Sequence, residues 1–138
     1  DLRVAANQVT KLEWCERRRP EFELYVSQLV LAEAEMGDAD AARRRLAALE
    51  GIPVLVASMA AEALGDALVT DRVVAATARV DAYHIALAAT HGMDYLLTWN
   101  CTHIANATKR LAIEACCRAR GLEPPAICTP QELTEAPT

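Results

Sequence analysis

The most informative feature of this sequence is a set of oxygen-bearing side chains at helix and strand positions. Asp81 lies near the start of an Ala-rich segment that ends at a His-Gly stop, and a short apolar run from Tyr95 to Thr98 follows. That run is typical of a strand whose carboxyl end delivers Thr98 and Asn100. Ligands of open parallel α/β sheets bind beyond the carboxyl ends of the strands. The pattern therefore predicts a site at this edge.

A second carboxylate, Glu33, lies on a predicted helix from Gln28 to Met36. At 100° per residue Glu33 falls near the centre of an apolar face, and we expect it to point inward. The residues that define this face are Leu29, Val30 and Met36. Asp81 has apolar neighbours at the same spacing, with His84 one turn later. The alternatives without a role in chemistry are that Glu33 lies at the helix rim and pairs with an arginine, and that Asp81 caps its helix.

Two inward carboxylates in one cleft repel each other unless a cation neutralises them. Glu33, Asp81 and Asn100 offer only oxygen ligands, which favours Mg²⁺ or Mn²⁺. Such an ion can activate a water for attack on a phosphodiester and stabilise charge on the phosphoryl oxygens. The residue types therefore indicate metal-assisted hydrolysis.

The sequence around Asp81 also resembles a known family. The pattern D-A-x-H-I-A-x-A, followed by H-G-x-x-x-L-L-T-W-N-C-x-H-I-A-N, is similar to that of PIN-domain nucleases, especially the toxins of VapBC toxin-antitoxin pairs. The resemblance covers the chain from about Ala5 to Leu133. It implies a Mg²⁺-dependent endoribonuclease of toxin type, an antitoxin partner and a homodimer.

The resemblance also implies roles for individual residues. Glu33, in its x-x-E-x-x-x-G-D setting, matches the second acid of the family, and Asp81 matches the third. Asn100 stands at the fourth acidic position, where it can still act as a ligand through its carbonyl oxygen. Thr98 and Asn106 are expected to position waters or substrate at the cleft.

Helical and strand patterns alternate along the chain, which predicts a single domain over residues 1–138 with a short parallel sheet between helices, a three-layer α/β/α sandwich. The expected strands are Phe22–Val26, Pro53–Ala57, Tyr95–Thr98 and Ala126–Cys128. The expected helices are Val4–Arg18, Gln28–Met36, Ala39–Leu49 with Asp38 as its cap, Ala60–Leu68, Arg79–His91 and Asn106–Arg120.

Members of the resembled family begin with a central strand that ends in an acidic residue, and we expect this strand and its acid to be missing here. The chain starts at Asp1 and reads as entering its first helix at Val4. A sheet without a central strand has unpaired inner edges that recruit other strands. Together with the apolar residues Val9, Leu12 and Trp14, this predicts a homodimer or larger assembly.

Histidine and cysteine offer competing readings. Cys101 and His103, with Cys116-Cys117 or Cys128, form a possible zinc site, but the spacing fits structural zinc poorly. His84 either orients Asp81 or contacts phosphate, unless it is an ordinary packed histidine, and His103 has similar alternatives. A Cys101 nucleophile with a histidine base is weaker, because no residue marks an oxyanion hole.

Composition limits the function further. At 138 residues and 53% hydrophobic, the chain can bury one core, and it carries a net charge of −5. That charge argues against broad nucleic-acid binding, and we expect arginine runs such as 17–19 and 43–45 to be mostly solvated and paired with nearby acids. Five cysteines without C-x-x-C spacing, no membrane span and no signal peptide favour a cytoplasmic protein.

These observations together predict a Mg²⁺- or Mn²⁺-dependent endoribonuclease that uses Glu33, Asp81 and Asn100. Because only two of these three ligands are carboxylates, the site would hold its ion weakly. The alternative is a catalytically degenerate PIN module that binds RNA or a protein partner.

Overall fold

The computed structural model describes residues 2–6, 22–98 and 107–128. Its strands are β1 (Leu2–Ala6), β2 (Phe22–Ser27), β3 (Val54–Leu55), β4 (Tyr95–Leu97) and β5 (Ala126–Cys128). Its helices are α2 (Gln28–Ala34), α3 (Ala39–Leu49), α4 (Met59–Thr70), the 3-10 turn η3 (Ala76–Ala78), α5 (Arg79–Thr90) and α6 (Ala107–Ala119). None of the described helices is long and apolar enough to cross a membrane.

The five described strands form one parallel sheet in the order β3-β2-β1-β4-β5. Alternate residues of a strand point to opposite faces, and two separate cores form accordingly. Ala5, Leu96 and Ile127 belong to the core shared with α4, α5 and α6. Their neighbours Val4, Leu97 and Cys128 belong to the core shared with α2 and α3. The fold is therefore a three-layer α/β/α sandwich, as the sequence predicts.

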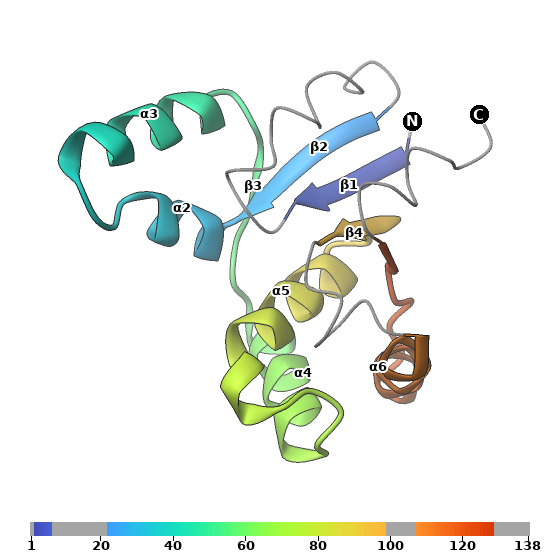
Figure 1. The fold of residues 1–138 in the computed structure, drawn as a ribbon. Coiled ribbons are helices and arrows are strands. Elements are labelled where there is room, and N and C mark those ends of the chain that lie inside the picture. Colours follow the sequence, from blue (N-terminus) through green and yellow to red (C-terminus); the bar gives the residue numbers. More distant parts are fainter. Residues whose placement is uncertain (1, 7–21, 99–106, 129–138) are drawn as a thin grey trace.

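Figure 1 shows how the helices divide between the two faces. α4, α5 and α6 lie together on one side of the sheet, whereas α2 and α3 lie next to β2 and β3. The contact between α4 and α5 is the most extensive between any two described elements. It is built from fully buried side chains that include Leu64, Leu68 and Ile85. This packing fixes α5, which carries Asp81 and His84, against the sheet.

The first predicted helix is wrong where the structure describes it. Leu2–Ala6 is a strand in the middle of the sheet, paired with β2 on one side and β4 on the other. Val4, Ala5 and Ala6 are all buried, and an unbroken apolar run is typical of a parallel strand covered on both faces. The central gap that we expected is thus filled by this strand. Asn7, not an acid, follows it in the sequence, and Val9, Leu12 and Trp14 lie outside the described residues.

The remaining described strands and α-helices match the prediction within two residues at each end, whereas η3 was not predicted. Asp38 caps α3, because its Oδ2 accepts a hydrogen bond of 3.0 Å from the Ala41 amide. The helix predicted to reach Met36 ends at Ala34 instead. Gly37 follows with φ +87°, a conformation that L side chains rarely adopt, and so closes the segment.

Candidate acidic site at the carboxyl edge of the sheet

Three adjacent strands end together and define the edge where the candidate residues lie. Ala6, the last residue of β1, pairs with Val26 on one side and with Leu97 on the other. Ser27 and Thr98, the next residues of those two chain segments, therefore flank the end of β1. Two strand spacings place them about 10 Å apart. The carboxyl edge thus brings α2 and the end of β4 close to each other.

Ser27 connects β2 to α2 and begins the helix. Its backbone is extended, and its hydroxyl oxygen accepts a hydrogen bond of 3.3 Å from the Val30 amide. This N-cap satisfies one of the amides that a helix leaves unpaired in its first turn. Ser27 is only 4% exposed, and the same oxygen lies 3.2 Å from Nδ1 of His84. The cap of α2 is therefore also a contact with α5.

His84 is a buried polar residue of α5 that contacts Ser27 and Glu33 at α2. It is 4% exposed, and its second ring nitrogen, Nε2, lies 4.0 Å from Oε1 of Glu33. The Glu33 side chain is 47% exposed. Ser27, His84 and Glu33 thus form a continuous polar connection from a buried hydroxyl to an accessible carboxylate. This connection makes His84 both a packed histidine and a neighbour of a candidate acid.

The predicted inward orientation of Glu33 is wrong in degree. α2 has only seven residues, and its buried members are Val30 and Ala34. Met36, which the helical projection placed on the same face, lies beyond the helix and is 67% exposed. Glu33 therefore stands at the rim of the buried face, with solvent on one side and His84 on the other. A rim position leaves its carboxylate accessible to an ion.

Asp81 is the third residue of α5 and is partly buried. The cap position of α5 belongs to Ala78, which makes no side-chain cap hydrogen bond, so the capping alternative for Asp81 does not apply. Residues three apart on a helix are neighbours, with Cβ atoms about 5–6 Å apart. Asp81 and His84 are related in this way. His84 thus has one candidate carboxylate, Glu33, beside its ring and the other, Asp81, one turn earlier on its own helix.

The described arginines beside α2 have structural partners. Arg45 of α3 donates from Nε to the Ala34 carbonyl oxygen at 3.2 Å and from Nη2 to the Met36 carbonyl oxygen. It thereby satisfies carbonyl groups that the end of α2 would otherwise leave unpaired. Arg43 pairs with Asp40 at 3.2 Å. The expected pairing with a nearby acid is confirmed for Arg43, whereas Arg45 binds backbone carbonyl oxygens instead.

Other predicted site residues divide into buried and undescribed ones. Thr98 is 0% exposed, and its amide donates to the Cys128 carbonyl oxygen at 2.9 Å, so it supports the edge from within. Asn100, His103 and Asn106 lie outside the described residues. Cys101 of the zinc alternative lies there too, whereas Cys116 is partly buried and Cys117 and Cys128 are buried.

The described part of the site offers a divalent metal only a few oxygen ligands. In residues 2–6, 22–98 and 107–128, no three His, Cys, Asp or Glu side chains gather as metal ligands. The described part of the site offers two carboxylates, from Glu33 and Asp81. Carboxylate oxygens and retained waters suit Mg²⁺, which is commonly bound through one or two carboxylates. The described residues therefore fit a hard cation with few protein ligands.

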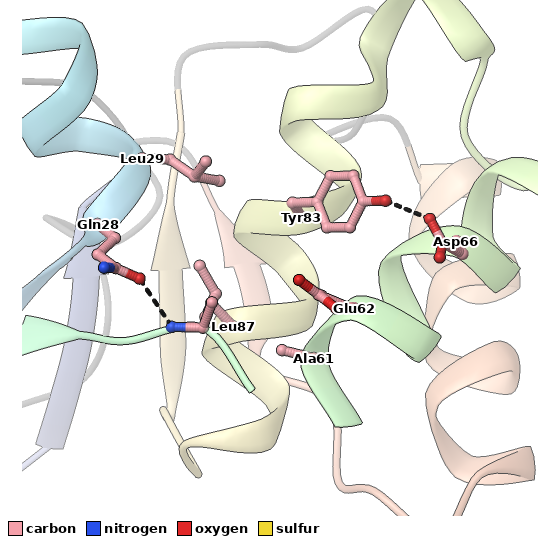
Figure 2. Close-up of a pocket in the computed structure, with 8 residues that line it drawn as sticks. Gln28, Leu29, Ala61, Glu62, Asp66, Tyr83 and Leu87 are labelled. Atoms are coloured by element: carbon pink, nitrogen blue, oxygen red, sulfur yellow. Dashed lines mark hydrogen bonds between the residues drawn. The ribbon is translucent and has the colours of Figure 1, made fainter. Parts of the chain in front are cut away.

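A cavity of about 460 Å³ lies next to this site and was not predicted. Figure 2 shows Tyr83 donating a hydrogen bond to Asp66, Gln28 accepting one from the Ala57 amide, and Glu62 pointing into the space between them. The remaining lining residues are Leu29, Ala61 and Leu87. Two carboxylates in the lining repel phosphate, so this cavity does not suit the backbone of a nucleic acid.

The sequence contained a signal for one residue that the prediction missed. Ser27 directly precedes an apolar helical run, which is a typical start for a helix. That signal predicts a cap, but only the tertiary structure, which brings His84 of α5 to the start of α2, reveals the contact with His84. For the cavity, the spacing of Glu62 and Asp66 indicates that they share one face of α4. Tyr83 of α5 joins them only in the tertiary structure.

Comparisons with known proteins bear on the fold. No family model and no curated protein matches the sequence. Among solved structures, the chain is similar to a chain of the VapBC2 complex from Rickettsia felis, determined bound to a DNA fragment from their promoter. The TM-score is 0.58 at 11% sequence identity, and the alignment covers 93% of this chain and 98% of that chain. The chain thus has a PIN-like α/β/α fold.

Proposed function

We propose that this protein is a Mg²⁺- or Mn²⁺-dependent endoribonuclease of the VapC toxin type. The observation that carries the proposal is the Glu33 carboxylate beside the His84 ring at the carboxyl edge of a parallel sheet, with Asp81 one helical turn before His84 on α5. Ligands of open α/β sheets bind at this edge. The fold likeness to a VapBC2 complex supports the same reading.

In this proposal the chain binds the ion and orients the substrate. Glu33 and Asp81 would hold the ion through carboxylate oxygens, and Asn100 would add its amide oxygen. When bound, the ion would activate a water and stabilise charge on the phosphoryl oxygens. Asn106 and His103 would contact the RNA near the cleaved bond. Thr98 acts by holding the strand end, because a fully buried side chain cannot touch the substrate.

Partners follow from the same reading. The matched structure contains a toxin-antitoxin pair on DNA, and we infer that this chain also pairs with an antitoxin protein. A second copy of the chain is also proposed. Val54, Val56 and Met59 are exposed along the edge strand β3 and the start of α4, at 36%, 53% and 88%. An edge strand with apolar neighbours is a surface that a second subunit can cover.

The test compares Glu33→Gln and Asp81→Asn with matched controls. Each substitution keeps the volume and removes one charge, which is worth on the order of 4 kcal/mol at 4 Å and an effective dielectric of 20, before desolvation. We therefore expect about a 100-fold or greater loss of RNA cleavage. Glu35→Gln, on the same segment but exposed, and Asp71→Asn, exposed after α4, should cleave normally.

Cleavage should also require added Mg²⁺ or Mn²⁺ and stop with chelator. Activity that survives chelator, or that survives both acid substitutions, contradicts the proposed mechanism. RNA binding without cleavage, in a chain that is folded by circular dichroism, would favour the degenerate binding module instead. The metal titration and the cleavage gel together separate these outcomes.

A further inference from the structure

We propose that Ser27 fixes the tautomer of His84, so that the protonated Nε2 faces Glu33 and His84 acts as a positioning residue for that carboxylate. The inference rests on the proposed function in one respect only, namely that Glu33 is a ligand of the cation. The tautomer itself follows from contacts within the folded chain. It can be observed without metal or RNA.

The direction of the Ser27 to His84 hydrogen bond follows from the helix cap. The Ser27 oxygen already accepts from the Val30 amide at 3.3 Å, and within the described residues its other contact is His84 Nδ1 at 3.2 Å. A hydroxyl has a single hydrogen to donate, and the lone pair of Nδ1 is the acceptor in reach. If Ser27 donates to Nδ1, the neutral ring carries its proton on Nε2.

The opposite arrangement has two costs. With the proton on Nδ1, both Val30 and His84 would donate to the Ser27 oxygen, and the buried hydroxyl hydrogen would have no acceptor among the described contacts. A buried donor without a partner is unfavourable. The Nε2 lone pair would also face the Glu33 carboxylate, 4.0 Å away. Two electron-rich groups at that distance repel each other.

The consequence concerns the Glu33 carboxylate. At 4.0 Å the contact is an attraction between the N–H dipole and the carboxylate, longer than a hydrogen bond. The ring is buried, with its side chain only 3% exposed, so water does not compete for it. The other end of the ring is held by the cap of a helix that also carries Glu33. The ring therefore restrains Oε1 and leaves Oε2 available to bind a cation. Outer contacts of this kind change metal affinity by about 10–100-fold.

The decisive measurement is long-range ¹H–¹⁵N NMR of the imidazole nitrogens at pH 8, on the full chain without metal. His91 provides an internal reference, because its Nε2 lies 2.9 Å from the Val56 carbonyl oxygen and must donate to it. We expect His84 to show the same Nε2–H pattern as His91, whereas an Nδ1–H pattern would overturn the proposal. Because this reading needs neither activity nor a variant, it stands apart from the failure of the proposed nuclease function.

Variants test the positioning role through Mn²⁺ affinity, measured by calorimetry. Ser27→Ala removes the donor to His84 together with a helix cap, and Ser58→Ala removes only a cap, the one that accepts from the Ala61 amide of α4. We expect about tenfold weaker Mn²⁺ binding and a mixed tautomer in Ser27→Ala, with neither change in Ser58→Ala. Equal effects in Ser27→Ala and Ser58→Ala would show that Ser27 acts only as a helix cap and would overturn the proposal.

Two further substitutions separate the ring nitrogens. His84→Gln can present an amide N–H where Nε2 lies, whereas His84→Asn reaches only the position of Nδ1. If presenting an N–H to Glu33 is the role of His84, His84→Gln should bind Mn²⁺ more tightly than His84→Asn. Equal loss in the two variants would show that the N–H beside Glu33 has no effect on the cation.

Discussion

Gly65 provides a sharp test of the packing between α4 and α5. It is a buried residue in the middle of α4, and a Cβ added to it would lie 2.4 Å from Cδ1 and 2.6 Å from Cε1 of Tyr83. Contacts that short cannot exist, so the Tyr83 ring must move in Gly65→Ala. The substitution therefore opposes two effects, a tertiary clash and a gain in helix propensity.

The two effects differ enough in size for the sign to be predicted. Overpacking a buried position costs about 1–3 kcal/mol, while Ala in place of Gly inside a helix gains about 0.5–1 kcal/mol. We expect Gly65→Ala to lower the free energy of unfolding by about 1 kcal/mol, or roughly 3–5 °C in Tm at this chain length. In a Tyr83→Ala background the clash is absent, so the same substitution should stabilise by about 0.5–1 kcal/mol.

The assay is urea unfolding followed by circular dichroism, with Ala63→Gly as the control for propensity at an exposed position of α4. A second readout is the Tyr83 phenol. Its hydrogen bond to Asp66, followed by burial, raises its pKa, and displacement of the ring should lower that pKa toward the ordinary value. If Gly65→Ala stabilises equally in both backgrounds and leaves the phenol titration unchanged, the close contact is not present in solution.

Three other predictions concern separate parts of the molecule. Arg45→Ala should lower the free energy of unfolding, measured by urea denaturation, by about 1–2 kcal/mol, because it leaves carbonyl groups at the end of α2 without this donor. The control Arg44→Ala, at an exposed position, should change the free energy of unfolding by less than about 0.5 kcal/mol. Burial raises the pKa of Cys117 to about 11 from 9.0, so the stability that the buried neutral thiol contributes is intact below pH 9 and is lost as pH rises toward 11. Two pKa units correspond to about 3 kcal/mol, and unfolding curves at pH 8 and 11 should differ less in Cys117→Ala. Sedimentation should show a homodimer at micromolar concentration that Met59→Glu weakens, and a monomeric parent chain would contradict the proposed covering of β3.

The sequence predicted the fold well because its signals are local and consistent. The α3 helix was placed correctly by its Asp38 cap, and the end of α5 by the His91-Gly92 stop. Alternating helices and strands then require a parallel sheet covered on both faces. The exception is β1. Three consecutive apolar residues at its end fit a buried strand or a helix equally well, and only the pairing with β2 and β4 decides between them.

The sequence predicted the relation of Asp81 to His84 but not the contacts around these residues. Helical spacing put Asp81 and His84 on one face, which the structure retains. The same reasoning failed for Glu33, because a projection assumes that the helix continues, and α2 stops after two turns. The contact between Ser27 and His84 joins residues 57 positions apart, so it depends on the tertiary structure that brings α5 to the start of α2. Periodicity within one segment carries no such information.

Stability alone gives little reason for a histidine at position 84. Its neighbours on α5 are apolar and fully packed, among them Ile85, Ala86 and Ala88 at 0% exposure. A buried polar side chain needs its hydrogen bonds to offset the loss of water, and replacing both partners by apolar groups is often neutral. The contact with a half-exposed Glu33 adds little, since ion pairs with an accessible partner contribute at most about 1 kcal/mol. What His84 does provide is a fixed N–H beside a carboxylate at the open edge of the sheet. The placement is therefore better explained by the orientation of Glu33 than by the stability of the fold.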